Sequence, residues 1–261
     1  MMREARQHPA QGLQRQDIKI TDIQVTPLSY THDGEYLWRC GGLYVWKADA
    51  ALLQVFTDQG VVGIAEGSPY RGPDRLKQYT DRYIRPLLLG ANIFDVDLLT
   101  NNQGHNSVAE GAWAGVNNAL WDAIGKAVDQ PVYKLLSDEV SPSNQVRIYA
   151  SGGVCHAWYD KGEEELIEEA LRYKAAGYDT FKFRNGTSWK HSGMTMEQYI
   201  VVLERLREAV GPEFKLVLEK FPWPYEQILK ELCPVLEALR FYWFEEPVEH
   251  TGPVALEQHL A

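Results

Sequence analysis

The sequence of 261 residues contains few cysteines, no long apolar run and no excess of positive charge. Its three cysteines, Cys40, Cys155 and Cys233, are far apart and lack metal-ligand spacing, so we expect reduced, core-packed thiols in a cytoplasmic protein. No apolar run approaches the roughly 18 residues of a membrane-spanning helix, and we therefore expect no membrane partner. The formal net charge of −10 also disfavours a nucleic-acid partner, because binding to phosphate backbones depends on Lys and Arg.

What the sequence does contain is the composition of a globular protein, with 45% hydrophobic and 24% charged residues. Residues 1–17 are polar, and no apolar segment follows their basic residues, so they do not have the pattern of a secretory signal. We interpret residues 1–17 as a polar N-terminal tail. A vector or start-codon artefact is the alternative.

The pattern of residues 18–145 predicts an α+β domain. Residues 18–28 alternate as in a strand, and residues 48–67 have the pattern of a β-hairpin that turns at Thr-Asp-Gln-Gly. Helical spacing then runs from residue 72 to 90 and again from 108 to 131. This order indicates a small antiparallel sheet followed by helices, with a linker at 141–145.

Residues 146–261 have a different rhythm, in which short apolar strands alternate with helices. We expect strands at 146–153, 179–186, 214–221 and 241–247, each followed by a helix, with a kink at Cys233-Pro234 in the third helix. Such a βαβαβαβα order is typical of a parallel sheet with crossover helices.

Three of these strands end in charged residues. Because side chains alternate across a strand, Lys182 and Arg184 share one face, and Glu219 and Glu245 can lie on the corresponding face of the next two strands. The C-terminal ends of the strands build the active site of a βα barrel. Carboxylate oxygens there can bind Mg2+, which stabilises the charge that forms when a proton α to a carboxylate is removed.

Other roles for these side chains stay open. A glutamate at a strand end also suits the N-terminus of the following helix, and Lys182 can be a surface lysine or a base whose pKa is lowered by its surroundings. Glu246 faces away from Glu245 by alternation and suits a supporting salt bridge. His250 and His32 can reach a site or lie in solvated loops.

On these residues the sequence resembles the enolase superfamily, in its mandelate racemase and muconate-lactonizing branch. In the first domain the resemblance depends on residues 60–67 (GVVGIAEG) and 117–136 (NNALWDAIGKAVDQPVYKLL). In the second it depends on residues 175–186 (AAGYDTFKFRNG) and 241–250 (FYWFEEPVEH). It covers nearly all of residues 18–261.

The resemblance implies an α+β capping domain followed by an α/β TIM-type barrel, a modified (β/α)7β fold of which residues 146–261 supply the first four βα units. It also implies Mg2+ held by one acid from each of three consecutive strands, the usual arrangement beside a Lys or His base. Glu219 and Glu245 match the first two ligands, and Lys182 and Arg184 match the two basic positions. The loop at 31–42 then corresponds to a lid that binds substrate, with contributions from Tyr30, His32, Trp38, Arg39 and, from the loop after Glu245, His250. Family members are commonly homo-oligomers.

The sequence departs from the family pattern in three respects. Arg184 occupies the position of the usual catalytic lysine, and because an arginine is a poor base, the base is Lys182 or lies elsewhere. Glu219 stands where Asp-x-Asn is usual. A TIM barrel typically needs about 250 residues, and the third ligand belongs to a strand beyond residue 261, so we expect a C-terminally truncated chain.

We predict Mg-dependent dehydration of a sugar acid, because the expected lid is polar. Racemisation or epimerisation by the same superfamily is the first alternative, since its first half-reaction is identical. The second alternative is a non-catalytic relic that acts as a binding or assembly protein.

Overall fold

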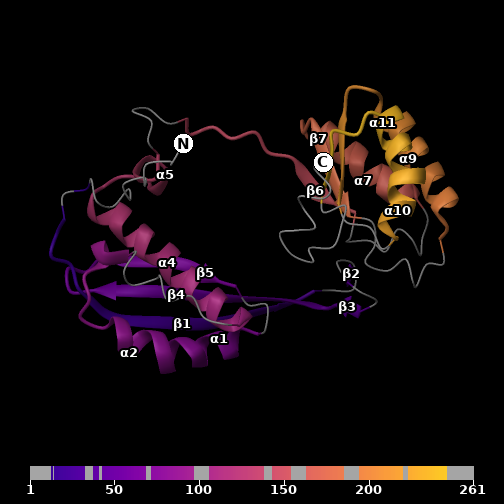
Figure 1. Ribbon diagram of the computed structural model, residues 1–261. Helices are drawn as coiled ribbons and strands as arrows, with labels where there is room; N and C mark the ends of the chain where they lie inside the picture. Colours follow the sequence, from indigo (N-terminus) through magenta and orange to yellow (C-terminus); the bar gives the residue numbers. More distant parts are fainter. Residues whose placement is uncertain are drawn as a thin grey trace. The chain divides into compact units, whose positions relative to one another are not determined.

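The computed structural model describes residues 13, 15–32, 38–40, 43–68, 72–96, 106–137, 143–153, 163–184, 194–219 and 223–245. The chain divides into two compact units (Figure 1). The first comprises Met1–Thr31 and Lys47–Val146, and the second comprises His32–Trp46 and Arg147–Ala261. No helix in the described ranges is long and apolar enough to cross a membrane.

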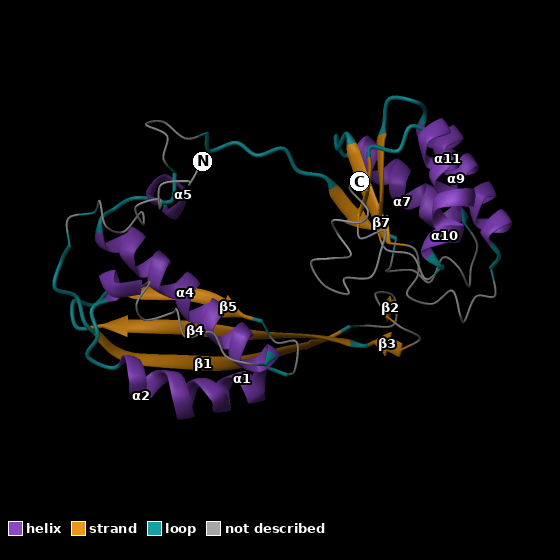
Figure 2. Cartoon of the chain, viewed as in Figure 1, coloured by secondary structure: helices purple, strands orange, loops and turns teal. Residues whose placement is uncertain are grey.

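The first unit contains a three-stranded antiparallel sheet in the order β1-β4-β5 (Figure 2). Its strands are β1 (Ile20–Thr31), β4 (Lys47–Thr57) and β5 (Val62–Gly67). The expected hairpin is confirmed: Thr57 N donates to Val61 O at 3.1 Å, and Gly60 has a φ of 76°, which favours glycine. Ile23 and Val25 on β1 lie buried opposite Val55 and Leu53 on β4, so one face of the sheet enters the core.

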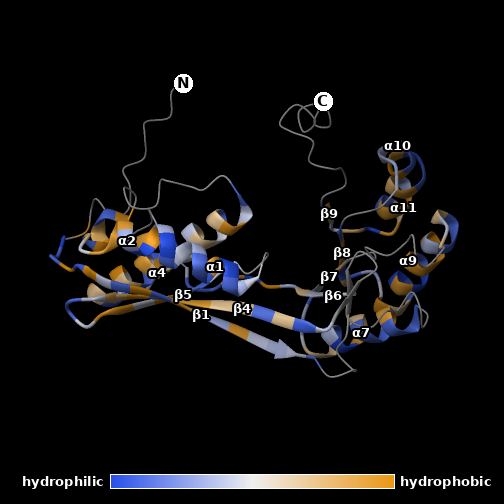
Figure 3. Ribbon diagram, turned by 90° about the horizontal axis from the view of Figure 1, so that it is seen from below, coloured by the Kyte–Doolittle hydropathy of each residue, from blue (hydrophilic) through white to orange (hydrophobic). Residues whose placement is uncertain are grey.

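Helix α4 (Ser107–Ala127) packs against β5 through glycines. A Cβ atom at Gly63 would lie 2.0 Å from the backbone oxygen of Ala119, and one at Gly115 would lie 2.8 Å from Cα of Gly67. Asn106 caps the helix by accepting from two backbone N–H groups. Figure 3 shows both hydrophobic and hydrophilic residues along α4, as expected of a helix with one buried face.

Within its described residues this unit also contains α1 (Pro73–Tyr79), the π-helical turn η3 (Thr80–Ile84), α2 (Arg85–Leu88), the 3-10 turn η4 (Ile93–Asp95) and α5 (Val132–Leu135). The helix expected over 72–90 is therefore present, with a π turn inside it. Pro86 follows that turn and has no N–H to donate to the carbonyl four residues earlier, which accounts for the irregularity. The same arrangement recurs before Pro234, where the sequence predicts a kink.

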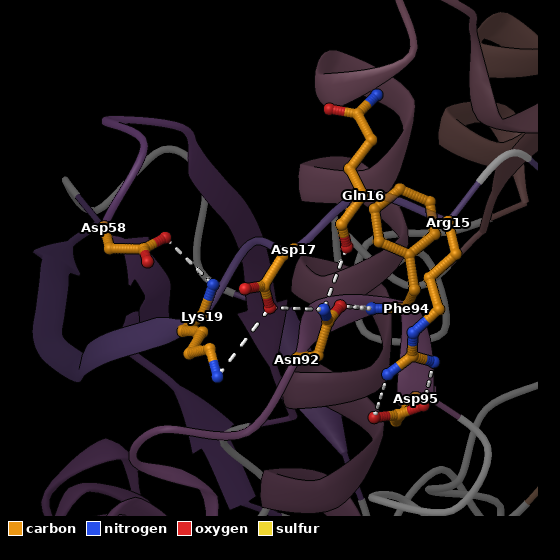
Figure 4. Close-up of polar contacts among 8 residues, drawn as sticks. All are labelled: Arg15, Gln16, Asp17, Lys19, Asp58, Asn92, Phe94 and Asp95. Carbon is orange, nitrogen blue, oxygen red and sulfur yellow. Dashed lines mark hydrogen bonds and ion pairs between the residues drawn. The ribbon is translucent and has the colours of Figure 1, made fainter.

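The segment that precedes β1 is held by polar contacts, which Figure 4 shows. The Arg15 guanidinium binds both carboxylate oxygens of Asp95, one of them at 2.8 Å. Asn92 Nδ2 donates to the backbone oxygen of Gln16 at 2.8 Å, and Asn92 Oδ1 accepts from Phe94 N at 3.0 Å. Residues 15–17 are therefore bonded to the first unit, whereas the sequence analysis assigned them to the polar tail.

The second unit contains a parallel sheet in the order β6-β7-β8-β9. Its strands are β6 (Ala150–Gly152), β7 (Thr180–Arg184), β8 (Lys215–Glu219) and β9 (Trp243–Glu245). The connections contain α7 (Glu164–Ala175), α9 (Met196–Val210) and the run of α10 (Tyr225–Gln227), η5 (Ile228–Leu232) and α11 (Cys233–Ala238). A short hairpin, β2 (Trp38–Cys40) with β3 (Leu43–Val45), groups with this unit. The four parallel strands are confirmed, and the expected fourth helix lies outside the described residues.

The first parallel strand is shorter than its sequence pattern predicts. Only Ala150–Gly152 pair with β7, and the preceding residues Val146 and Ile148 are 83% and 64% exposed. The apolar alternation of 146–153 is that of a strand, but a strand also needs a hydrogen-bonding neighbour. Residues 146–149 have no ladder partner among the described residues.

Candidate active site

The strand register of the parallel sheet separates an apolar face from a polar one. Phe181 and Phe183 of β7 lie beside Leu216 and Leu218 of β8, and all four pack in the core beneath the helices. The alternate residues occupy the opposite face, where Arg184, Glu219 and Glu245 stand side by side on β7, β8 and β9. Because parallel strands end at the same edge, the positions of these three residues lie at one level at the C-terminal end of the sheet.

Lys182 joins two of these strand ends. Its Nζ lies 2.7 Å from Oε2 of Glu219 and 2.9 Å from Oε1 of Glu245. The side chains of Lys182 and Glu219 are 11% and 9% exposed, while that of Glu245 is 37% exposed. Of the four residues that the sequence analysis placed on one face, Lys182 is therefore in direct contact with two, Glu219 and Glu245.

The pKa of Lys182 is not lowered by its surroundings, as the interpretation of this lysine as a base would require. Burial acts to lower its pKa, but the hydrogen bonds and charges of Glu219 and Glu245 outweigh burial, and the pKa is raised above its ordinary value. Two carboxylates within hydrogen-bonding distance stabilise the ammonium form. In this arrangement the Lys182 ammonium donates to both carboxylates.

The other expected site residues stay predictions. Arg184 pairs in register with Glu219, and its side chain lies outside the description, as do the side chains of Trp38 and Arg39 on β2. Residues 246 and 250, the positions of Glu246 and His250, are outside the described residues. Tyr30 lies near the end of β1 opposite Ala48, and His32 follows β1 with its backbone N donating to Trp46 O at 2.9 Å.

The carboxylates of Glu219 and Glu245 have the chemistry of a Mg2+ site, since they are hard oxygen donors on neighbouring strands at one level of the sheet. In the part of the chain that the structure describes, no cluster of three or more His, Cys, Asp or Glu side chains could hold a metal. Glu219 and Glu245 are two ligands, fewer than such a cluster, and would therefore supply only part of a Mg2+ ligand set.

Two aromatic residues beside Lys182 were missed by the sequence analysis. Lys182 Nζ lies 6.0 Å from the centroid of the Tyr149 ring, and that ring meets the ring of Trp243 edge-on at 5.6 Å. Tyr149 precedes β6 and Trp243 begins β9, so the sheet is curved enough for rings from its two edges to meet. Alternation could have found Trp243, which lies two residues before Glu245 and shares its face.

The comparisons with known families agree with this architecture. Residues 43–137 match the N-terminal domain of mandelate racemase / muconate lactonizing enzyme, and residues 165–259 match the enolase C-terminal domain-like family. The chain belongs to the mandelate racemase and muconate-lactonizing branch of the enolase superfamily. The resemblance and the fold class predicted from the sequence, a capping domain with part of an α/β barrel, are thereby confirmed.

The similar proteins include ones named as sugar-acid dehydratases. The chain is 28% identical to arabinonate dehydratase of Saccharolobus solfataricus, over 93% of this chain and 64% of that protein. It is 27% identical to D-xylonate dehydratase of Haloferax volcanii, over 89% of this chain and 55% of that protein. The chain thus spans less than two thirds of the length of these relatives.

Solved structures give the same picture. A member of the enolase superfamily from Polaromonas sp. JS666 superposes with a TM-score of 0.73 at 27% identity. The 3,6-anhydro-D-galactonate cycloisomerase of Zobellia galactanivorans superposes with a TM-score of 0.72 at 25% identity. Each match covers 92% of this chain and 62% of the other.

Proposed function

We propose that the parallel sheet carries part of an active site that removes the proton α to the carboxylate of a sugar acid, with dehydration as the overall reaction. The observation that carries this proposal is the contact of Lys182 with Glu219 and Glu245 at the C-terminal ends of three neighbouring strands. The names of the relatives, arabinonate and D-xylonate dehydratase, support a sugar acid as the substrate class.

The proposed dehydration proceeds through an enolate. A base takes the α-proton, the electron pair of the C–H bond forms an enolate, and the β-hydroxyl leaves as water after it receives a proton. The enol that results tautomerises to a 2-keto-3-deoxy acid. Lys182 donates hydrogen bonds to the negative charge that develops, and Arg184 binds the substrate carboxylate in bidentate fashion.

Glu219 and Glu245 would hold Mg2+, together with a ligand that the described residues do not include. When bound, Mg2+ supplies Lewis-acid stabilisation of the negative charge on the substrate. Glu246 supports this set, and Tyr30, His32, Trp38, Arg39 and His250 read the far end of the substrate. We further propose that the protein is cytoplasmic and forms a homo-oligomer. Light scattering would test the oligomeric state.

The test is incubation of the 261-residue chain with arabinonate, xylonate and galactonate in deuterated buffer containing Mg2+, followed by proton NMR. A 2-keto-3-deoxy product supports dehydration. Deuterium at the α-carbon together with inversion would indicate the racemase alternative. Absence of both, from a chain shown to be folded, would reject catalysis by this chain and favour the non-catalytic relic.

Glu219→Gln is the matched variant for this test. It keeps the size of the side chain and removes its charge. We expect it to lose the α-proton exchange at least 100-fold. Equal exchange by the variant and the parent chain would mean that the observed chemistry does not use this site.

A further inference from the structure

The ammonium group of Lys182 is bounded on two sides by different kinds of partner. The carboxylates of Glu219 and Glu245 lie at hydrogen-bonding distance from Nζ, and the Tyr149 ring lies 6.0 Å from Nζ. Trp243 meets that ring with an interplanar angle of 74°. The Lys182 ammonium therefore lies between the two carboxylates and the Tyr149 ring.

The strand register explains how the aromatic pair comes to lie below the carboxylates. Ser151 of β6 pairs with Lys182. Tyr149 lies just before β6, and its ring centroid is 6.0 Å from Lys182 Nζ. Trp243 pairs with Val217 and lies two residues before Glu245. Both rings thus occupy levels of the sheet nearer its N-terminal end than the two glutamates.

The two contacts restrict a side chain that is otherwise flexible. A lysine has a four-carbon stem with many rotamers, and its ammonium carries three donors that can turn in several directions. An aromatic face attracts a cation within about 6 Å of its centroid. An edge-to-face neighbour holds such a ring in place, as Trp243 does for Tyr149.

We propose that Tyr149 and Trp243 are positioning residues that hold the Lys182 ammonium against Glu219 and Glu245. Tyr149 supplies the aromatic face, and Trp243 fixes the orientation of that ring. The consequence for catalysis rests on the proposed function, in which Lys182 faces the substrate. The positioning itself does not depend on turnover.

NMR of the 261-residue chain with 13C-labelled lysine tests the positioning directly. A lysine whose end lies over an aromatic ring shows an upfield shift of its Cε protons, and disappearance of the signal in Lys182→Arg identifies it. We expect Tyr149→Phe to retain the shift and Tyr149→Leu to lose it, because leucine fills space without offering an aromatic face. An unchanged shift in Tyr149→Leu would overturn the proposal.

The same sheet offers a matched control. Lys215 Nζ lies 5.1 Å from the centroid of Tyr242, which is also in contact with Trp243 at 5.1 Å. Tyr242→Leu should move the Lys215 signal and leave that of Lys182 in place. Movement of both lysine signals by either leucine variant would mean a general loosening of the sheet and would also overturn the proposal.

Trp243 is tested by two variants in the same spectra. Trp243→Phe keeps an aromatic edge against Tyr149 and should retain most of the upfield shift of Lys182, whereas Trp243→Leu should reduce it at least twofold. Equal shifts in the two variants would remove Trp243 from the proposal.

Exchange of the α-proton provides the functional readout. If the parent chain turns over a sugar acid, Tyr149→Leu should lower kcat about tenfold and change KM less than twofold. Tyr149→Phe should keep the kcat of the parent chain. If the parent chain shows no exchange, the proposed function fails while the lysine spectra still decide whether the pair positions Lys182.

Discussion

The two units use their sheets in opposite ways. The antiparallel sheet of the first unit brings α4 so close to β5 that a Cβ atom at Gly63 or Gly115 would overlap backbone atoms. The parallel sheet of the second unit has one face packed under helices, while its other face carries Lys182, Glu219 and Glu245. The close contacts of the first unit hold a helix against the sheet, whereas those of the second unit hold charged groups together at one edge of the sheet.

This difference teaches where each unit is sensitive to substitution. In the first unit a single added methyl group meets backbone atoms that cannot move independently. In the second unit the sensitive feature is the cluster of Lys182, Glu219 and Glu245. Their ion pairs offset the free-energy cost of removing these charges from water. Substitutions of each kind should therefore destabilise one unit and spare the other.

The largest effect is expected for Gly63→Ala in the first unit. The new Cβ would lie 2.0 Å from the backbone oxygen of Ala119, so strand and helix must separate. We expect a loss of about 3 kcal/mol in the free energy of unfolding, at the upper end of the usual cost of overpacking. Urea unfolding measures the loss, and amide hydrogen exchange in α4 assigns it to this unit.

Gly67→Ala is the control for this substitution. Its Cβ would meet the side-chain methyl groups of Leu76 at 2.9 and 3.0 Å, and a side chain can shift more easily than backbone. We expect about 1 kcal/mol of destabilisation. A greater loss for Gly67→Ala than for Gly63→Ala would contradict the role assigned to the backbone contact.

A somewhat smaller effect is expected for Lys182→Met in the second unit. In the variant the buried Glu219 loses its ammonium partner. The carboxylate of Glu245, which shared that partner, remains on the neighbouring strand. Because Glu245 is partly exposed, we expect about 2 kcal/mol, below the usual cost of breaking a fully buried pair. Urea unfolding with hydrogen exchange in β7 and β8 checks this value.

Lys215→Met provides the comparison for the Lys182 variant. Lys215 pairs with Asp179 at 3.3 Å in a more exposed setting, where an ion pair contributes less than about 1 kcal/mol. Equal losses for the two lysine variants would show that burial does not set the strength of the Lys182 cluster.

A loss of about 1 kcal/mol is expected for Thr195→Ala at the start of α9. Thr195 forms a capping box with Gln198, in which each side chain bonds to the backbone N–H of the other residue. Thr195→Ser should restore most of the stability. The prediction fails if alanine and serine give the same melting temperature.

The smallest effect concerns the pH dependence of the first unit. Hydrogen bonds from Gln24 and Arg85 hold the pKa of Asp22 below its ordinary value. A depressed native pKa stabilises the fold above the ordinary aspartate pKa, and this contribution is lost as pH falls through the native value. The gap in melting temperature between parent and Asp22→Asn should therefore narrow on acidification below about pH 4. Parallel curves would refute this linkage.

Part of the candidate site could be predicted because strand geometry is local. Alternation with a period of two placed Lys182, Glu219 and Glu245 on one face, and the βα order placed their strands side by side. The hairpin turn at Gly60 and the π turns before Pro86 and Pro234 also follow from local rules.

Other features depend on neighbours that are distant in the chain. Tyr149 has no local signal that points to Lys182, because their contact depends on the curvature of the sheet. The raised pKa of Lys182 depends on two carboxylates from other strands. Arg15 and Gln16 have the composition of a polar tail, yet they bond to Asp95 and Asn92.

The sequence by itself determined the two-part organisation, the parallel strand order and the shared face of the charged residues, since these depend on residue periodicity and turn chemistry. Only the tertiary structure decided how far the first parallel strand pairs, in which direction the pKa of Lys182 shifts and which aromatic ring lies beside its ammonium. The physical reason is that hydrogen-bond ladders, burial and electrostatic energies depend on distances between segments that sequence separation does not specify.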